Sequence, residues 1–322
     1  MKYLLDCDPG IDDAMAIMML VKSGADIAGI TTTHGNSNAR NTAKNAMKVL
    51  EHVLHRKDIP VAVGESRPLS GVRVDAGHVH GKDGLAETAL PRPKTPFVKQ
   101  HAVDFMKEKI SENKDDIKLV STGPLTNIAR LLKKYPTVGR DVAELVMMAG
   151  AINVPGNITQ VAEFNVYADP YAASHVFENS TIRKTLVPAD VANKVILTPS
   201  YLEEKTKTLR NESNKEVADF LVRIASFYQK FFIEKLGRIG DQIFNGCAMY
   251  DPLAVGYAIN PSFIKRKEPM SVHVETRGTY TKGETVAELR GGFRNQTLPN
   301  MDVCLDTNAS EFLDYFMLTV LS

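Results

Sequence analysis

The first half of the chain alternates short apolar runs with stretches of helical periodicity. The apolar runs predict strands over residues 2–7, 25–33, 60–63, 117–121 and 144–148, and the stretches between them predict helices over residues 12–22, 38–55, 97–112 and 124–134. Successive strand–helix units of this kind build a mainly parallel sheet that is covered by helices. Residues 64–96 are rich in Gly, Pro and charged side chains, so we expect a long irregular loop there, as many functional loops are.

The second half begins with a Gly- and Asn-rich stretch over residues 149–165, which interrupts the alternation. Beyond it the pattern predicts helices over residues 169–179, 215–236, 251–259 and 310–321, and strands over residues 185–187, 270–276, 285–289 and 301–305. The last three strands indicate a small C-terminal β portion. Because no internal repeat, low-complexity segment or linker interrupts the chain, we expect residues 1–322 to form a single α/β domain with a mainly parallel central sheet flanked by helices.

Charge and composition exclude several classes of function. Lys and Arg number 39 against 38 Asp and Glu, a formal net charge of +1, so no electrostatic excess favours nucleic acid or an anionic membrane. No apolar run reaches the ~20 residues that span a bilayer, and carboxylates and a Pro-Gly turn interrupt the N-terminal residues before a signal peptide could form. We therefore expect a cytosolic protein with a small-molecule partner. Its three scattered cysteines, Cys7, Cys247 and Cys304, are expected to be reduced and buried.

Four aspartates, Asp6, Asp8, Asp12 and Asp13, lie between the first predicted strand and the first predicted helix. The turn after a parallel strand faces the crevice where open α/β sheets bind ligands. Capping of the helix would account for one aspartate there, but not for four. Their mutual repulsion requires a cation, protons or hydrogen-bond donors, and oxygen ligands without Cys or paired His favour Ca²⁺ or Mg²⁺ over zinc. Ca²⁺ also accepts an irregular shell of about six to eight ligands.

The segment from Asp6 to Asp13, D-x-D-P-G-x-D-D, resembles the signature of the inosine-uridine preferring nucleoside hydrolases. Further segments match in the same order, namely residues 33–36 (THGN), 80–85 (HGKDGL), 122–127 (TGPLTN), 156–157 (GN), 162–165 (AEFN) and 251–255 (DPLAV). The resemblance covers most of the chain. It implies a Rossmann-like nucleoside hydrolase fold, hydrolysis of the N-glycosidic bond of ribonucleosides to free base and ribose, and a homodimer or homotetramer.

The same resemblance implies a Ca²⁺ site and a nucleophile. The ion would be held by the carboxylates of Asp8, Asp13 and Asp251 and by the backbone carbonyl of Thr122. A water on that ion would attack, with Asp8 as the base that takes its proton.

The resemblance also implies a ribose site that binds the sugar hydroxyls and would make 2′-deoxynucleosides poor substrates. Its polar members would be Asp12, Asn36, Asn157, Glu163 and Asn165. Met148 and Phe164 would supply apolar contacts near the sugar. Because Glu163 and Asn165 lie two apart in a strand-like apolar stretch, we expect them to share one face.

One position departs from the family pattern. Many members have a histidine before the aspartate that matches Asp251, where it is thought to protonate the leaving base, and here that position is Tyr250. Tyrosine is a much weaker acid than imidazolium, so leaving-group activation by Tyr250 is in question. We hypothesise that His80 contacts or helps to activate the base. Tyr228 and Gln229 on the predicted long helix can also reach it, and with no tryptophan in the chain, base stacking must come from Phe or Tyr.

Two alternatives remain open at this stage. Asp6-x-Asp8 resembles the nucleophile motif of Mg²⁺-dependent aspartate-based phosphatases, although no basic phosphate clamp is evident. A non-catalytic, Ca²⁺-dependent nucleoside- or sugar-binding protein would use nearly the same ligands.

Overall fold

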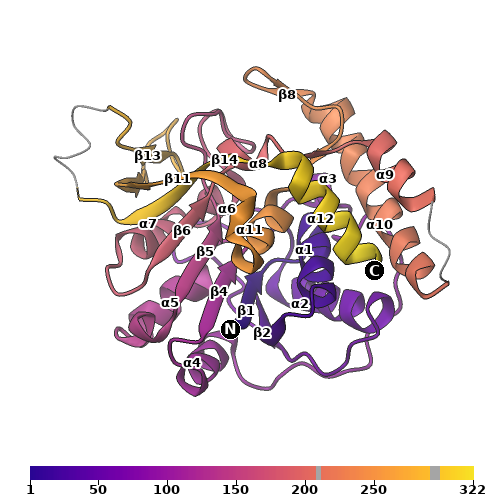
Figure 1. Ribbon diagram of the computed structural model, residues 1–322. Coiled ribbons are helices and arrows are strands. Elements are labelled where there is room, and N and C mark those ends of the chain that lie inside the picture. Colours follow the sequence, from indigo (N-terminus) through magenta and orange to yellow (C-terminus); the bar gives the residue numbers. More distant parts are fainter. Residues whose placement is uncertain (208–211, 291–297) are drawn as a thin grey trace.

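The computed structural model describes residues 1–207, 212–290 and 298–322. Its central sheet contains β1 (Lys2–Cys7), β2 (Asp26–Thr32), β3 (Val61–Val63), β4 (Ile117–Ser121), β5 (Glu144–Met148), β6 (Lys184–Val187), β11 (Ile264–Met270) and β14 (Met301–Thr307). The eight strands follow the order β11-β14-β6-β5-β4-β1-β2-β3 (Figure 1). Every neighbouring pair is parallel except β11 with β14. The predicted mainly parallel α/β sheet is thus confirmed.

Helices cover both faces of this sheet (Figure 1). One face carries α1 (Ile11–Lys22), α2 (Ala39–Lys48), α10 (Glu212–Lys230), α11 (Tyr250–Ile259) and α12 (Ala309–Leu321), and the other carries α4 (Ala102–Glu112), α5 (Thr126–Lys134) and α7 (Pro170–Glu178). The two-residue period of β1 divides its side chains between them: Leu5 and Cys7 join the first core, and Leu4 joins the second. Because α1 packs between the sheet and other helices, it is apolar on most sides.

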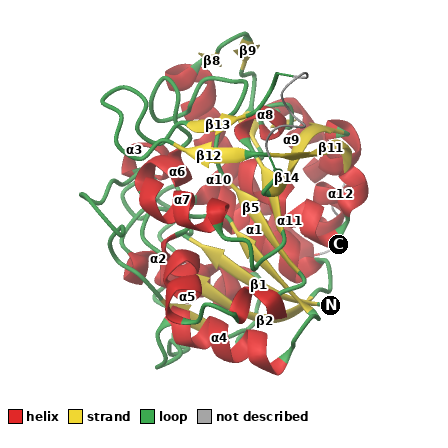
Figure 2. Cartoon of the chain, turned by 90° about the vertical axis from the view of Figure 1, so that its left-hand side faces the viewer, coloured by secondary structure: helices red, strands yellow, loops and turns green. Residues whose placement is uncertain are grey.

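Short elements complete the described chain. They are the helical turns η1 (Val49–Val53), α3 (Gly77–His80), η2 (Val138–Asp141), α6 (Phe164–Ala168), α8 (Ala189–Ala192), α9 (Pro199–Lys207), η3 (Phe231–Leu236) and η4 (Pro261–Phe263), and the strands β7 (Ile196–Leu197), β8 (Arg238–Ile239), β9 (Gln242–Ile243), β10 (Cys247–Ala248), β12 (Val272–Val274) and β13 (Thr285–Ala287). Figure 2 shows β12 and β13 beside α6 and α7, where they form a small C-terminal β portion. The third strand expected in that portion, over residues 301–305, is instead β14 of the central sheet.

Several element predictions need correction. The helix expected from residue 97 begins at Ala102, because residues before it extend along β3, where Val98 bridges Ala62. The strand expected over residues 270–276 is β12 alone, over residues 272–274. The strand β11 and the helix α9 were not predicted at all. The edge strand β11 exposes charged side chains, so it lacks the apolar alternation of a half-buried strand.

Two expectations drawn from composition can be compared with the fold. All three cysteines are buried and unbonded, as predicted. Among the described residues, no helix has both the length and the apolar character that a membrane crossing would require.

The strand order creates a topological switch point beside β1. From β1 the chain builds outward through β2 and β3 on one side, and through β4, β5, β6 and β14 on the other. Helical connections diverge at such a point, so a crevice opens beyond the carboxyl ends of β1 and β4. The first two residues beyond these ends are Asp8 and Thr122, which places the predicted acidic turn at the mouth of the crevice.

Candidate active site

Asp8 is enclosed by two backbone segments that only glycine allows to approach so closely. A Cβ built on Gly35 would lie 2.0 Å from Asp8 Oδ2, and one on Gly123 would lie 2.6 Å from Asp8 Oδ1. The backbone N–H of Asn36 donates to Oδ2 over 2.7 Å. Oδ1 is buried and has no hydrogen-bond partner in the described part of the chain. A buried carboxylate oxygen without a donor indicates a site that a cation or water completes.

Asp13 collects donors from three separate segments of the chain. Its Oδ1 accepts from the Thr122 hydroxyl over 2.8 Å, and its Oδ2 accepts from the Gly10 backbone N–H over 3.0 Å and from Asn36 Nδ2 over 3.2 Å. The backbone N–H of Asp8 also lies 3.3 Å from Oδ1. This carboxylate therefore holds the turn, the end of β4 and the loop after β2 together.

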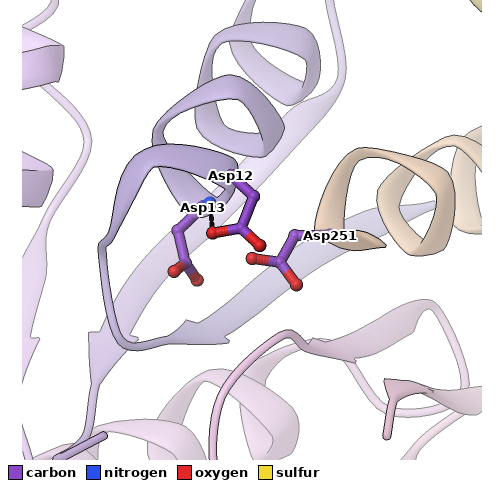
Figure 3. Close-up of side chains that lie close together, drawn as sticks. All are labelled: Asp12, Asp13 and Asp251. Atoms are coloured by element: carbon purple, nitrogen blue, oxygen red, sulfur yellow. Dashed lines mark hydrogen bonds between the residues drawn. The ribbon is translucent and has the colours of Figure 1, made fainter. Parts of the chain in front are cut away.

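Three carboxylates, including that of Asp13, converge at one point of the crevice. Asp12 and Asp13 come from the first turn of α1 and Asp251 from the first turn of α11, and Figure 3 shows them pointing toward one another. One oxygen from each lies within 4.8 Å of the other two. Asp251 is separated from the other two by more than 200 residues of sequence, so tertiary structure alone creates the cluster.

Electrostatics show that these acids are poorly accommodated by the protein alone. Burial, followed by repulsion from Asp13, raises the pKa of Asp8 well above its ordinary value, and burial followed by Asp12 does the same for Asp251. The pKa of Asp13 rises to about 6 through burial and Asp12. No lysine or arginine of residues 1–207, 212–290 and 298–322 forms an ion pair with these carboxylates. The donor set is oxygen only, so it fits a hard divalent cation.

Asp6 supports the cluster from below without joining it. Its Oδ1 accepts from Asn127 Nδ2 of α5 over 2.8 Å and from the Thr31 hydroxyl of β2 over 2.7 Å. Burial raises its pKa to about 7. Asp6 thus anchors the end of β1 to β2 and to α5.

A pocket opens directly onto the acidic cluster. Most of the residues expected in the site line it, namely Asp12, Asn36, His80, Thr122, Met148, Asn157, Glu163, Phe164, Asn165, Tyr250 and Asp251. The remaining two, Asp8 and Asp13, lie beneath it and join it through Asn36, Thr122 and Asp12. The structure therefore brings together residues that the sequence spreads over nearly 250 positions.

One local expectation for these residues is wrong. Glu163 and Asn165 do not share a strand, because Glu163 is the N-cap of α6 and Asn165 belongs to its first turn. The Glu163 carboxylate accepts from the backbone N–H groups of Asn165, Val166 and Gly150. A glutamate that caps a helix still has a lone pair to offer a ligand, and it keeps its place at the pocket wall.

Asn165 joins the ends of two parallel strands. Its Nδ2 donates to the carbonyl oxygens of Thr122, over 2.9 Å, and of Met148, over 3.0 Å. These are the positions directly after β4 and at the end of β5. Asn165 thereby fixes the carbonyl that was expected to face a cation.

The far side of the pocket is aromatic. Tyr228, Phe231 and Phe232 from the end of α10 and from η3 line it, together with His78 and His80 of α3. The rings of His80 and Tyr228 lie 5.6 Å apart, and those of His78 and Phe231 lie 6.1 Å apart. The expected stacking surface of Phe and Tyr is thus present.

Two expectations on the long helix have different outcomes. Tyr228 lines the pocket and donates to Asp12 Oδ2 over 3.0 Å, so its hydroxyl serves the acidic cluster. Gln229 does not line the pocket and donates to the carbonyl oxygen of Leu197, so of the two positions open to it, near the base or in ordinary packing, it takes the second. The difference follows from the helix, since adjacent residues point about 100° apart.

Sequence reasoning missed several residues of the site. Phe231, Phe232 and Leu236 line the pocket, and their spacing on a helix gave the available signal. Asn193, which accepts a hydrogen bond from the Tyr250 hydroxyl over 2.7 Å, had no signal in the sequence. Its role depends on contacts made after folding.

With this geometry in view, comparison with known proteins identifies the class of the chain. The model of the inosine-uridine preferring nucleoside hydrolase family matches residues 3–314. The pyrimidine-specific ribonucleoside hydrolase RihA of Shigella boydii is 36% identical over 316 residues, which cover 97% of this chain and 95% of the relative. The chain therefore belongs to the inosine-uridine preferring nucleoside hydrolase family.

Solved structures agree with this assignment. The purine-preferring ribonucleoside hydrolase from Gardnerella vaginalis has a TM-score of 0.88 and 27% identity, and the match covers 100% of this chain and 98% of that one. A plant nucleoside hydrolase gives a TM-score of 0.88 at 27% identity, with 100% and 99% covered. The protein is thus an enzyme that hydrolyses the N-glycosidic bond of ribonucleosides, and it has an aspartate cluster able to bind a metal ion.

Proposed function

We propose that the enzyme is Ca²⁺-dependent and that Asp8, Asp13, Asp251 and the Thr122 carbonyl hold the ion. The observation that carries this proposal is the buried convergence of Asp12, Asp13 and Asp251 at the switch point, without a lysine or arginine partner among the described residues. Asp8 lies outside that group of three, and its buried Oδ1, which has no donor among the described residues, supports its place in the ligand set. When bound, the cation would offset the carboxylate repulsion and polarise a water for attack. Asp12 lies within the same 4.8 Å cluster, so it can act either on the ion or on a ribose hydroxyl beside it.

Asp8 is proposed as the general base. Its Oδ2 is held by the Asn36 backbone N–H, whereas Oδ1 has no hydrogen-bond partner among the residues that the structure describes and can take a proton from an attacking water. The fixed backbone on both sides, at Gly35 and Gly123, leaves the carboxylate little freedom to turn. A base that is held in one orientation loses little entropy when the transition state forms.

Asp12, Asn157, Glu163 and Asn165 are proposed to bind the ribose. The carboxylates of Asp12 and Glu163 and the Oδ1 of Asn165 can accept from sugar hydroxyls, Asn157 can also donate, and all four line the pocket. Asn36 also lines it, but its Nδ2 donates to Asp13 and to the Asp8 carbonyl, so we infer that Asn36 serves mainly to hold the acids. The carboxylates would also stabilise a ribosyl cation as its charge develops.

His80 is proposed to contact the leaving base, with Met148 and Phe164 packing near the sugar. His80 lines the pocket, with its Nδ1 4.0 Å from Asp12 Oδ1, and is buried against Tyr228. Apolar surroundings exclude water, so a hydrogen bond from His80 to the base would be stronger than in solution.

A panel of nucleosides tests these proposals. Inosine, uridine, cytidine, adenosine and their 2′-deoxy forms are incubated with the protein, with Ca²⁺ and with chelator, and the products are separated. We expect free base and ribose with Ca²⁺, loss of activity with chelator, recovery on adding Ca²⁺, and slow turnover of the 2′-deoxy forms. The panel also measures base preference, because one relative named above is pyrimidine-specific and another purine-preferring. Activity that survives chelation would rule out the cation.

The same incubation separates the alternatives. A Mg²⁺-dependent phosphatase would release phosphate from a phosphomonoester, but the buried Asp12, Asp13 and Asp251 would repel such a substrate. A binding protein without activity would hold nucleosides with measurable affinity and leave them intact. Family membership favours hydrolysis over both.

Three broader proposals concern the domain organisation, the assembly and the cellular location of the enzyme. We propose one nucleoside hydrolase domain over residues 1–322, which the family match over residues 3–314 supports. We also propose a homodimer or homotetramer that acts in the cytoplasm, with no nucleic-acid or membrane partner. Light scattering of the purified protein tests the assembly, and a single species with the mass of one chain, 35.5 kDa, would contradict it.

A further inference from the structure

One hydrogen bond in the pocket wall holds Tyr250, the residue that replaces the usual histidine. The Tyr250 hydroxyl donates to Asn193 Oδ1 over 2.7 Å. Tyr250 and Asn193 are buried, with 4% and 3% of their surface exposed. Asn157 lies near the same hydroxyl, because its side chain opposes the burial that raises the pKa of Tyr250. The hydrogen bond therefore joins the first residue of α11 to the residue that follows α8.

The backbone sets the orientation of the Asn157 amide. A backbone N–H can only donate, so the Asn157 atom that meets the Phe164 N–H over 2.8 Å is its oxygen. The amide nitrogen, which can only donate, is the atom left to face Tyr250. A donor on that side agrees with the direction of the bond on the other, where the single Tyr250 proton goes to Asn193. The neighbouring groups thus assign the Asn157 amide, as they must wherever Asn oxygen and nitrogen have to be distinguished.

The consequence concerns what Tyr250 can offer a substrate. A phenol has one proton and two lone pairs, and here the proton is already used. Tyr250 lines the pocket, so its hydroxyl can offer a ligand there a lone pair but no proton. We propose that Asn193 is a positioning residue that fixes Tyr250 as a hydrogen-bond acceptor, so that Tyr250 selects an O–H or N–H donor on the nucleoside and does not protonate the leaving base.

This inference rests on the proposed nucleoside site and gives Tyr250 a specificity role in it. A general acid contributes to kcat, typically ~10²–10⁴-fold, whereas one hydrogen bond made equally in ground and transition states contributes to KM alone. Tyr250→Phe removes the hydroxyl and keeps the ring against Phe232. We expect a kcat within about 3-fold of the wild type and a KM raised roughly 3- to 10-fold, as for the loss of one neutral hydrogen bond.

Asn193→Leu tests the positioning role. It removes the acceptor while filling a similar volume, so the Tyr250 proton loses its partner and the hydroxyl can turn. We expect a raised KM in this variant, and no further rise when it is added to Tyr250→Phe, because the hydroxyl on which it acts is then gone. Additive effects in the double variant would show that Asn193 only packs, and would overturn its positioning role.

The outcomes separate this inference from the proposed function. A Tyr250→Phe protein that loses kcat about 100-fold or more with KM unchanged would identify Tyr250 as the acid and sink the inference, while the hydrolase function stands. A wild type that releases no base from the nucleoside panel would sink the function. In that case the same three variants are compared by their Kd for inosine and uridine, with the same expected pattern. Thermal unfolding of each variant checks that it folds.

Discussion

The backbone N–H of Ile11 donates to Nδ1 of His80 over 3.1 Å, which joins the first residue of α1 to the last residue of α3 in the pocket wall. Because Nδ1 accepts, a neutral His80 ring carries its proton on Nε2. Burial lowers the pKa of His80 to about 4, against an opposing effect of Asp13, so the ring is neutral at physiological pH. His80 is therefore prepared to act as a neutral hydrogen-bond donor.

His80→Ala should slow hydrolysis of natural nucleosides while sparing a substrate with a good leaving group. We expect kcat on the best nucleoside to fall roughly 10²–10³-fold, the usual contribution of one hydrogen-bond donor to developing negative charge. With p-nitrophenyl riboside, whose leaving anion is stable without a donor, the loss should be within about 10-fold. Steady-state kinetics on both substrates measure the difference.

His78→Ala is the matched control, since His78 lines the same pocket but is exposed and stacks on Phe231. This variant should change kcat on the two substrates by the same factor. An equal loss on both substrates in His80→Ala would show that His80 acts through the shape of the pocket and not on the leaving group.

The sequence predicted the aspartates of this site better than the other residues that line its pocket. Asp8, Asp12 and Asp13 lie in one short segment. Because that segment follows a buried strand, it belongs at the ligand-binding edge of the sheet. Asp251 lies on another helix, and only the family resemblance linked it to the turn. Asn193 and the aromatic residues of η3 reach the pocket through tertiary packing, which no local pattern encodes.

The errors in the fold have a common physical origin. The strand β11 hydrogen-bonds on one side only and carries solvent-facing charges, so its pairing with β14 is decided by tertiary structure. Glu163 and Asn165 looked like one face of a strand because alternation over three residues is also compatible with a helix cap and its first turn. Long buried strands, such as β1 and β5, were predicted within a residue of their ends.

Ca²⁺ should stabilise the protein more as pH rises. Burial raises the pKa of Asp6 to about 7, of Asp13 to about 6 and of Glu163 to about 7. The folded metal-free protein thus retains protons that the unfolded chain, with its lower pKa values, releases. Its free energy of unfolding therefore falls as pH rises from about 4 through about 7.

A cation held by Asp8, Asp13 and Asp251 would replace the protons on those three carboxylates, whose pKa values are all raised. Its stabilising effect should therefore be small at about pH 5 and larger at about pH 7.5. Thermal unfolding with Ca²⁺ and with chelator at both pH values measures this. Surface acids such as Asp58, whose pKa is lowered to about 2 by Arg56, make the free energy of unfolding rise with pH instead. Their effect is the same with Ca²⁺ and with chelator, so it cancels in the comparison. A Ca²⁺-induced rise in Tm that is independent of pH, or that shrinks as pH rises, would contradict the linkage.

The close approach of Gly35 to Asp8 allows metal binding to be separated from general stability. Gly24 and Gly35 both have positive φ, of 74° and 150°, so alanine strains the backbone at either. A Cβ at Gly24 meets nothing within 4 Å, whereas one at Gly35 would lie 2.0 Å from Asp8 Oδ2.

Gly24→Ala should therefore lower the free energy of unfolding by the backbone cost alone, about 1–2 kcal/mol, and leave Ca²⁺ affinity and kcat as they are. Gly35→Ala should also displace the Asp8 carboxylate, weakening Ca²⁺ binding in calorimetry and lowering kcat. Equal Ca²⁺ affinity in the two variants would show that the orientation of Asp8 does not matter to the ion, and would remove Asp8 from the proposed ligand set.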